Sequence, residues 1–341
     1  MGQLGYVLRR IRSLHVDQML NKVAELHRQT GKSRLFLFAD MINCGFRYQA
    51  GYMDYALFAM HSLGREQRKT VLTRGINNLY VAKLNAKSSW PVFEKKNLFL
   101  KKFSPFIGRE YLDLSDADFS AFVAFAKKHS LFIAKPPDGT HGDGVEKIDC
   151  TDENIYPALY ERLRANGQTL LEEVVVQHPD LAAIYPGSVN TIRVVSLVRG
   201  GKSHIVFAYF RIGNGGKHVD NFNNGGMVVP VDVTTGVIRA PAVDKVGHIF
   251  AAHPATGAPI EGAAIPLWQA CRDLVAAASL VISDVRYVGW DVAVTPAGPV
   301  LIEGNHFPGH DIYQLPAHTP DKIGVLPELQ AVYPLNELAS H

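Results

Sequence analysis

The chain has 341 residues, a mass of 37.5 kDa, a formal net charge of +3 and a hydrophobic content of 47%. This length allows two or three subdomains, because single hydrophobic cores rarely grow beyond about 250 to 300 residues. The near balance of Lys and Arg with Asp and Glu argues against a protein that binds nucleic acid through a strongly basic surface.

Cysteine use and hydropathy point to a cytoplasmic location. Cys44, Cys150 and Cys271 lie far apart and form no CxxC motif, which argues against a disulfide framework and a zinc knuckle. No secretory or lipidation signal is visible, and no apolar run approaches the roughly 18 to 20 residues of a membrane-spanning helix. We therefore expect a cytoplasmic protein with no membrane span.

Residues 1–91 are predicted to form a mostly helical region. Apolar residues recur at steps of three and four near the start, and residues 53–63 repeat the pattern. The run RLFLFAD (residues 34–40) is the main candidate for a strand. The start also carries a basic cluster, which a solvated helix face explains better than a phosphate or lipid contact. This cluster comprises Arg9, Arg10 and Arg12.

Residues 92–176 are predicted to form an α+β lobe. Asp116 is expected to cap a helix that runs through Ser130. LFIAK (131–135), VEKI (145–148) and TLLEEVVV (169–176) indicate strands, with a helix from Asp152 towards Asn166 between the last two. Two strands joined by a loop, then a crossover helix and a third strand, are typical of such a lobe.

Residues 177–335 are predicted to form a second, strand-rich lobe. A helix is expected from Pro266 to Ser283. The candidate strands read TIRVVSLV, SHIVFAYFRIG, GGMVVPVDV, YVGWDVAV and GPVLIEGN.

The loop after the strand LFIAK indicates a phosphate-binding site. Lys135 ends that strand, and Gly139, Gly142 and Gly144 follow it. Glycines allow backbone N–H groups to approach phosphate oxygens, and the lysine adds a fixed positive charge. The lysine precedes the glycines, so the loop is not a P-loop. A plain flexible hairpin explains this pattern equally well.

The stretch TLLEEVVVQ (169–177) is a candidate adenine-binding hinge. Its apolar strand ends in Glu172 and Glu173. A carboxylate at this position can accept from the exocyclic amine of adenine, and the backbone of Val175 can pair with the ring edge. Acidic residues at strand ends are common, and this pattern alone favours an ordinary strand end.

The stretch GWDVAVTPAGPVLIEGN (289–305) is a candidate metal site. A hairpin centred on residues 296–298 would place Asp291 across from Glu303, and the period of two puts Glu303 and Asn305 on one face. Oxygen ligands of this kind suit Mg²⁺ or Mn²⁺. The sequence therefore predicts that three oxygen ligands converge here.

In this order, the lysine with its glycine loop, the acidic hinge and the terminal D…ExN pattern resemble the ATP-grasp superfamily. QHPDLAAIYPGSVNTIRVVSL and RIGNGGKHVDNFNNGGMVVPVD are similar to its sugar-transfer associated group, which is related to α-L-glutamate ligase-like proteins. The resemblance covers residues 95–308 and implies an α+β fold in which two lobes clasp ATP. Residues 1–91 would be a substrate-binding region or a reduced form of the domain that often precedes the nucleotide lobe.

The resemblance implies further roles. Lys96, with Lys95 as the alternative, would be the first phosphate-binding lysine and Lys135 the second. Gln177 or Asp180 would lie near the ribose, although neither is the usual glutamate.

Two strand arginines, Arg193 and Arg211, would meet the γ-phosphate and the acyl phosphate, where fixed cations stabilise transferred negative charge. Surface ion pairs are the alternative for both. Asn221 and Asn223 would orient the acceptor or phosphate, although turn chemistry explains them equally well.

The implied activity is ligation of a small-molecule carboxylate to an amine through an acyl phosphate, with ATP and Mg²⁺ or Mn²⁺. The group's name points to a sugar or peptide building block in polysaccharide or secondary-metabolite biosynthesis. A kinase that phosphorylates a hydroxyl, and a nucleotide-binding protein without turnover, are the alternatives. Substrate identity and oligomeric state are left open.

Overall fold

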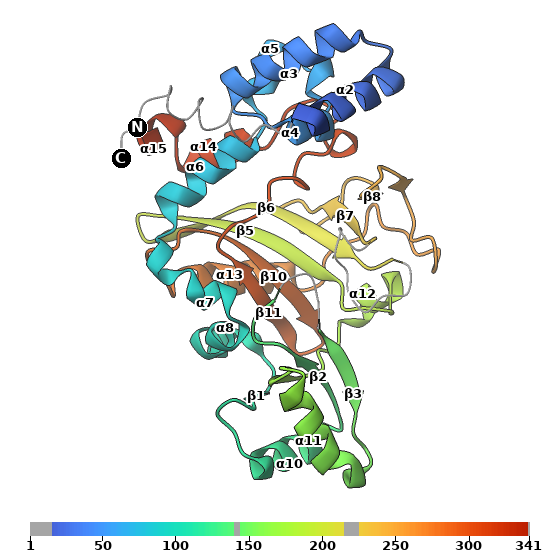
Figure 1. Ribbon diagram of the computed structural model, residues 1–341, viewed down its shortest axis with the longest axis vertical. Helices are drawn as coiled ribbons and strands as arrows, with labels where there is room; N and C mark the ends of the chain where they lie inside the picture. Colours follow the sequence, from blue (N-terminus) through green and yellow to red (C-terminus); the bar gives the residue numbers. More distant parts are fainter. Residues whose placement is uncertain (1–15, 140–143, 215–224, 340–341) are drawn as a thin grey trace. The chain divides into compact units, whose positions relative to one another are not determined.

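The computed structural model describes residues 16–139, 144–214 and 225–339. The chain divides into two compact units, one formed by the residues up to Lys83 together with those from Gly309 onward, the other by Leu84–Pro308 (Figure 1). The predicted segment 177–335 is thereby divided. The side-chain amide of Gln314 helps to hold the C-terminal residues in the first unit. It accepts from the backbone N–H of Leu72 at 3.0 Å and donates to the carbonyl of Leu72 at 2.7 Å.

The first unit is helical in the part that the structure describes. Met19, Val23 and Leu26 on α2 recur at helical spacing and enter its core. The RLFLFAD run, the strand candidate, instead begins α3, because the hydroxyl of Ser33 caps the helix by accepting from the N–H of Phe36. The helices are α2 (Val16–Thr30), α3 (Arg34–Tyr48), α4 (Tyr52–Leu57), α5 (Arg65–Lys69), α6 (Arg74–Leu84), α14 (Leu326–Val332) and α15 (Leu335–Ala339), with short 3-10 turns η1 (Met60–Ser62) and η5 (Pro316–His318).

The second unit contains a four-stranded antiparallel sheet in the order β1-β4-β2-β3. The strand and helix order predicted for this lobe is confirmed, but Asp118 rather than Asp116 caps α10, and β4 ends at Glu173 rather than Val176. Side chains of α10 and α11 form a core with the sheet. The elements are β1 (Tyr111–Asp113), α10 (Phe119–Lys128), β2 (Leu131–Lys135), β3 (Glu146–Asp149), η3 (Glu153–Ile155), α11 (Tyr156–Ala165) and β4 (Leu170–Glu173).

A seven-stranded antiparallel sheet forms the rest of the second unit, in the order β11-β10-β5-β6-β7-β8-β9. The five predicted strands and the predicted helix are present with small shifts at their ends. The elements are α12 (Pro179–Ile184), β5 (Thr191–Arg199), β6 (Lys202–Ile212), β7 (Met227–Pro230), β8 (Ala242–Asp244), β9 (Ile249–Phe250), α13 (Trp268–Ser279), β10 (Tyr287–Thr295) and β11 (Gly298–Asn305), with η2 (Lys87–Ser89), α7 (Pro91–Glu94), α8 (Lys96–Lys102) and α9 (Ser104–Ile107) before β1.

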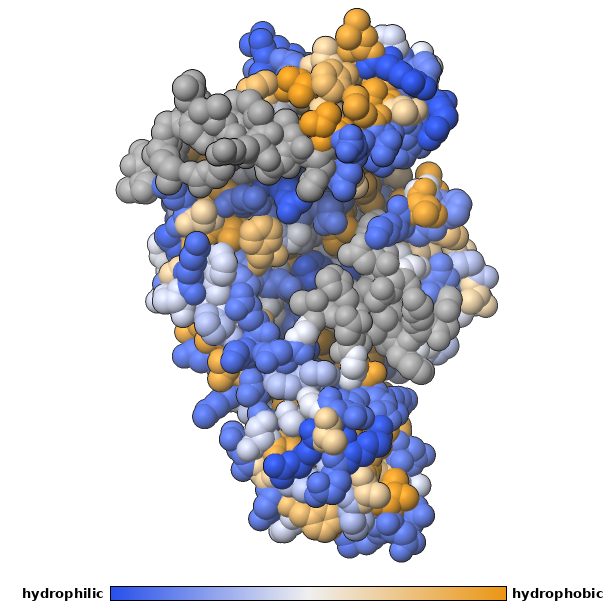
Figure 2. Space-filling model, viewed as in Figure 1, coloured by the Kyte–Doolittle hydropathy of each residue, from blue (hydrophilic) through white to orange (hydrophobic). Residues whose placement is uncertain are grey.

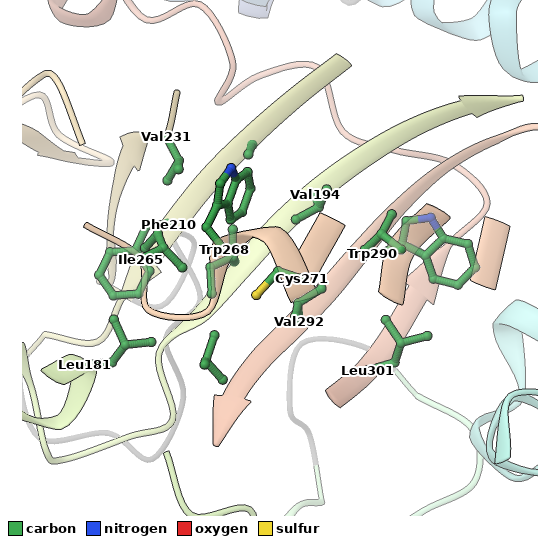
Figure 3. Close-up of a cluster of buried hydrophobic side chains, with 14 of the residues drawn as sticks. Leu181, Val194, Phe210, Val231, Ile265, Trp268, Cys271, Trp290, Val292 and Leu301 are labelled. Carbon is green, nitrogen blue, oxygen red and sulfur yellow. The ribbon is translucent and has the colours of Figure 1, made fainter. Parts of the chain in front are cut away.

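The core of this sheet lies on the face that packs against α13. Trp268 and Cys271 of α13 meet strand residues such as Val194 and Val292 in the cluster drawn in Figure 3. Successive side chains of a strand point to opposite faces, so the neighbours of these core residues face away from α13. Among the described helices, none combines the length and apolarity needed to cross a membrane.

Candidate active site

A row of charged side chains crosses three neighbouring strands on the sheet face away from α13. Arg193 of β5 lies opposite Asp291 of β10, which lies opposite Glu303 of β11. The predicted pairing of Asp291 with Glu303 is confirmed. It depends on a bulge after Asp291, because the turn at residues 296–297 pairs Val292 with Leu301, and that register alone would place Ile302 opposite Asp291. Arg193 binds Asp291 in a bidentate ion pair, with Nη2 3.0 Å from Oδ2 and Nε contacting Oδ1.

A second arginine reaches the same carboxylate from the next strand. The Nη2 of Arg211 on β6 lies 2.7 Å from Oδ2 of Asp291. The hydroxyl of Thr191 accepts from the same guanidinium at 2.7 and 3.0 Å, which fixes its orientation. Asp291 is 1% exposed. Burial alone would raise the pKa of Asp291, but the charges of Arg193 and Arg211 outweigh it and hold the pKa below its usual range.

Glu303 differs from Asp291 because its side chain stays accessible to solvent. The surrounding protein and the negative charge of Asp291 raise the pKa of Glu303. Asn305, two residues on, donates from Nδ2 to Glu303 Oε1 at 3.3 Å. A divalent cation would neutralise the repulsion between the two carboxylates, and the carboxylate and amide oxygens are the donors that Mg²⁺ prefers. The residues present therefore fit Mg²⁺.

The donor set is completed by an amide rather than by a third acid. Within the part of the chain that the structure describes, no group of three His, Cys, Asp or Glu side chains is placed to hold a metal ion. The predicted donor set of Asp291, Glu303 and Asn305 has two carboxylates and one amide, and both oxygens of Asp291 also contact Arg193 or Arg211. Its role as a metal site stays a prediction.

A buried cluster of opposite charges lies in the four-stranded sheet. Glu172 of β4 binds Lys135 of β2 through Oε1, and Arg109 Nε lies 2.7 Å from its Oε2. Burial alone would raise the pKa of Glu172, but Lys135 and Arg109 lower it to about 2. Glu172 is therefore ionised and already holds two cations. Its predicted contact with the adenine amine stays a prediction.

Lys96 lies at the start of α8 and reaches the glycine loop. Its Nζ donates to the carbonyl of Gly139 at 2.8 Å. Burial and the nearby charge of Lys135 lower the pKa of Lys96, so the two predicted phosphate-binding lysines share one neighbourhood. Gly144 has a φ of +71°, and a Cβ there would lie 2.9 Å from Pro136. A glycine is thus required where the loop returns to β3.

Some of the other residues predicted to bind adenine or ribose are hydrogen-bonded within the protein, and others face solvent. Glu173 accepts from the N–H of Glu110 at 3.0 Å. The side-chain amide of Gln177 donates to two backbone carbonyls and accepts from Asn190 at 3.0 Å. These hydrogen bonds hold the loop before β5 in place. The other two predicted residues lie after β4. Val175 is half-buried, and Asp180 is exposed beside His178.

Three predicted residues lie outside the described part of the chain. They are Gly142 of the glycine loop and the pair Asn221 and Asn223. Their predicted roles stay predictions. The alternative lysine, Lys95, precedes α8 with an exposed side chain.

The family described as sugar-transfer associated ATP-grasp matches residues 75–333, which is more than half of the chain. The chain belongs to this family. The ATP-grasp fold predicted from the sequence, with a helical region before the first strands, is therefore confirmed. A search of curated proteins finds no match.

Solved ATP-grasp structures resemble this member of the family at low identity. The ATP-grasp ligase PsnB, complexed with precursor peptide PsnA2 and AMPPNP, is 12% identical with a TM-score of 0.38, and the match covers 65% of this chain and 53% of PsnB. D-alanyl-alanine synthetase A from Vibrio cholerae is 17% identical with a TM-score of 0.43, and the match covers 74% of this chain and 67% of the synthetase. The D-alanine–D-alanine ligase from Bacillus anthracis is 12% identical with a TM-score of 0.43, covering 78% of this chain and 76% of the ligase. This ATP-grasp chain thus spans about half the length of PsnB.

Sequence reasoning missed two residues that contact members of the candidate site. Arg109 joins Glu172 to the carbonyls of Leu301 and Ile302 on β11, at 2.7 and 3.4 Å. Thr191 orients Arg211 through its hydroxyl. An available signal for Thr191 was its position two residues before Arg193, on the same face of one strand.

Proposed function

We propose that the chain is an ATP-dependent carboxylate–amine ligase that forms an amide through an acyl phosphate. The observation that carries this proposal is the row from Arg193 through Asp291 to Glu303, with Arg211 joined to Asp291. It combines two fixed guanidinium groups with an accessible carboxylate on one sheet face. Phosphoryl transfer needs this combination of charges, because it spreads negative charge over the transferred oxygens.

The nucleotide would be held by the second set of residues. Lys96 and Lys135, which share one neighbourhood, would bind phosphate oxygens beside the glycine loop. The end of β4, with Glu172, Glu173 and the backbone of Val175, would contact the adenine. The buried ion pairs of Glu172 support this proposal, since they fix the strand end on which the base would lie.

The proposed reaction has two steps. A carboxylate oxygen of the substrate attacks the γ-phosphorus of ATP, and the bond from that phosphorus to the bridging oxygen of ADP breaks. The amine nitrogen then attacks the acyl carbon, phosphate leaves, and the nitrogen loses a proton. Arg193 and Arg211 would orient the phosphoryl oxygens and the acyl phosphate. Mg²⁺, held by Asp291, Glu303 and Asn305, would neutralise phosphate charge.

Hydroxylamine gives a direct test, because it replaces an unknown amine and traps an acyl phosphate as a hydroxamate. A panel of amino acids, uronic acids and short peptides would be incubated with the protein, ATP, Mg²⁺ and hydroxylamine. We expect one class of carboxylates to release ADP and yield a hydroxamate of matching mass. ADP release with a phosphorylated hydroxyl product would instead identify a kinase.

An isotope experiment confirms the route for any active carboxylate. When both carboxylate oxygens carry ¹⁸O, the acyl-phosphate route transfers one label to the released phosphate. The Arg211→Lys variant should lose this transfer. Arg239→Lys is a matched control, because Arg239 is exposed and pairs with Asp232 in the turn region after β7. Unlabelled phosphate from the wild type would contradict the proposal.

A further inference from the structure

Helix α3 of the first unit carries apolar residues on two opposite faces. Leu37, Met41 and Cys44 form the inner face and are buried in the core. Leu35, Ala39, Ile42 and Phe46 follow one another at steps of four, three and four, which places them on the opposite side of the helix. A helix in a globular protein needs only the first of these faces for folding.

The outer face is largely uncovered. Leu35 is 80% exposed and Phe46 61%, Ala39 is also exposed, and Ile42 is half-buried. Phe36, on the side of the same helix, is 49% exposed. Figure 2 shows hydrophobic side chains gathered on the surface of these N-terminal helices. From Leu35 to Phe46 the outer face is roughly 16 Å long. Exposed apolar groups in this density mark an interaction surface.

Both ends of this face carry an arginine that has no acidic partner within the described part of the chain. Arg34 precedes Leu35 and Arg47 follows Phe46, and neither forms an ion pair among the described residues, nor does Arg28 at the end of α2. Lys32 lies over the ring of Phe36, 5.6 Å from its centre.

The nearby acids are mostly neutralised. Asp40 of α3 is held by Arg68, and Glu25 of α2 by Lys22. Residues 1–48 contain 8 of the 35 Lys and Arg residues but only 3 of the 32 Asp and Glu residues. The positive charge of the chain is therefore concentrated in the region that carries the exposed apolar face.

We propose that the outer face of α3 docks on an anionic lipid bilayer, with Leu35, Phe36 and Phe46 entering the headgroup region. Arg34 and Arg47 would then contact lipid phosphates. Leu and Phe flanked by Lys and Arg are typical of helices that lie in the membrane interface. A second copy of the chain fits less well, because either direction of packing α3 on itself brings Arg34 beside Arg34 or Arg47 of the copy.

Vesicle sedimentation of the full chain tests this proposal. The probes are vesicles of phosphatidylcholine alone and of phosphatidylcholine mixed with phosphatidylglycerol, at low and high salt. The variants are Leu35→Ser with Phe46→Ser, and Arg34→Glu with Arg47→Glu. A matched control in the second unit combines Val246→Ser with Lys245→Glu, which changes exposed residues of the same kinds in a turn.

We expect the wild type and the control to bind the anionic vesicles, with a lower affinity at high salt. The affinity of each α3 variant for these vesicles should be at least about tenfold lower. Circular dichroism should show that all variants keep their helix content. No binding of the wild type to anionic vesicles, or equal binding of the α3 variants, would overturn the proposal. Self-association that Phe46→Ser abolishes, without vesicle binding, would overturn it in favour of a dimer interface.

Discussion

The Nε of Arg109 lies 2.7 Å from Oε2 of Glu172, with both side chains almost completely buried. The same guanidinium donates from Nη1 to the carbonyl of Leu301, 2.7 Å away. Arg109 thereby joins the strand that ends in the predicted adenine hinge to the strand that carries Glu303 and Asn305. Arg109 is therefore one direct connection between the two parts of the candidate site.

Replacing Arg109 with Ala should destabilise the second unit by about 3 kcal/mol, because Glu172 loses a buried ion-pair partner and three carbonyls lose a donor. Urea unfolding followed by tryptophan fluorescence measures this change. Arg162→Ala is the control, since Arg162 pairs with Glu146 at a half-exposed site, where the loss should stay below about 1 kcal/mol. Equal effects of the two substitutions would contradict the role given to Arg109.

Glu172→Gln should change how stability depends on pH. The pKa of Glu172 falls from 4.5 to about 2 on folding, so its ionised form stabilises the protein fully above pH 4.5. This contribution, about 3 kcal/mol, is lost as the pH falls from 4.5 towards 2. The variant should be less stable than the wild type at pH 7 and should show a shallower loss of stability in this acidic range. Glu153→Gln, at an exposed ion pair, should leave the wild-type profile unchanged.

Glu303→Gln should separate metal binding from folding. The change removes repulsion between Glu303 and Asp291, so we expect equal or higher thermal stability without ligands. The rise in melting temperature caused by ATP with Mg²⁺ should shrink, and ADP release should fall about a hundredfold or more. A variant that keeps both the rise and the activity would show that Glu303 is not a metal ligand.

Thr191→Val should reduce turnover because it removes an acceptor that orients Arg211. The hydroxyl accepts from two nitrogens of that guanidinium, and valine has nearly the same shape without the oxygen. We expect kcat to fall about tenfold, with a smaller change in KM for ATP, because a misplaced arginine affects the transition state more than nucleotide binding. The matched change Thr256→Val alters a hydroxyl that donates to Ile184, away from the charged row, and should leave kcat unchanged.

Local patterns in the sequence were sufficient to predict much of the second unit. The period of two placed Glu303 and Asn305 on one face, and the short turn after β10 made the two strands neighbours. The pairing of Asp291 with Glu303 was predicted correctly, but it also needs the bulge after Asp291, which no local pattern indicated. The strand LFIAK and its lysine were also predicted with correct bounds. The prediction of a strand at RLFLFAD was wrong. An apolar run of seven residues is compatible with a buried strand or with a helix. The helical spacing of buried residues continues through Met41 and Cys44, and the segment is a helix.

Only the tertiary structure showed which charges meet. Arg109 and Glu172 are 63 residues apart, and Arg109 and Leu301 are 192 apart, distances at which no periodicity carries information. The same holds for the packing of the residues after Gly309 with the N-terminal helices. The sequence by itself determined which charged and polar residues the strands carry and therefore which chemistry the site offers. The folded chain decided the partners of those residues, because ion pairs between distant strands depend on how sheets pair and not on local spacing.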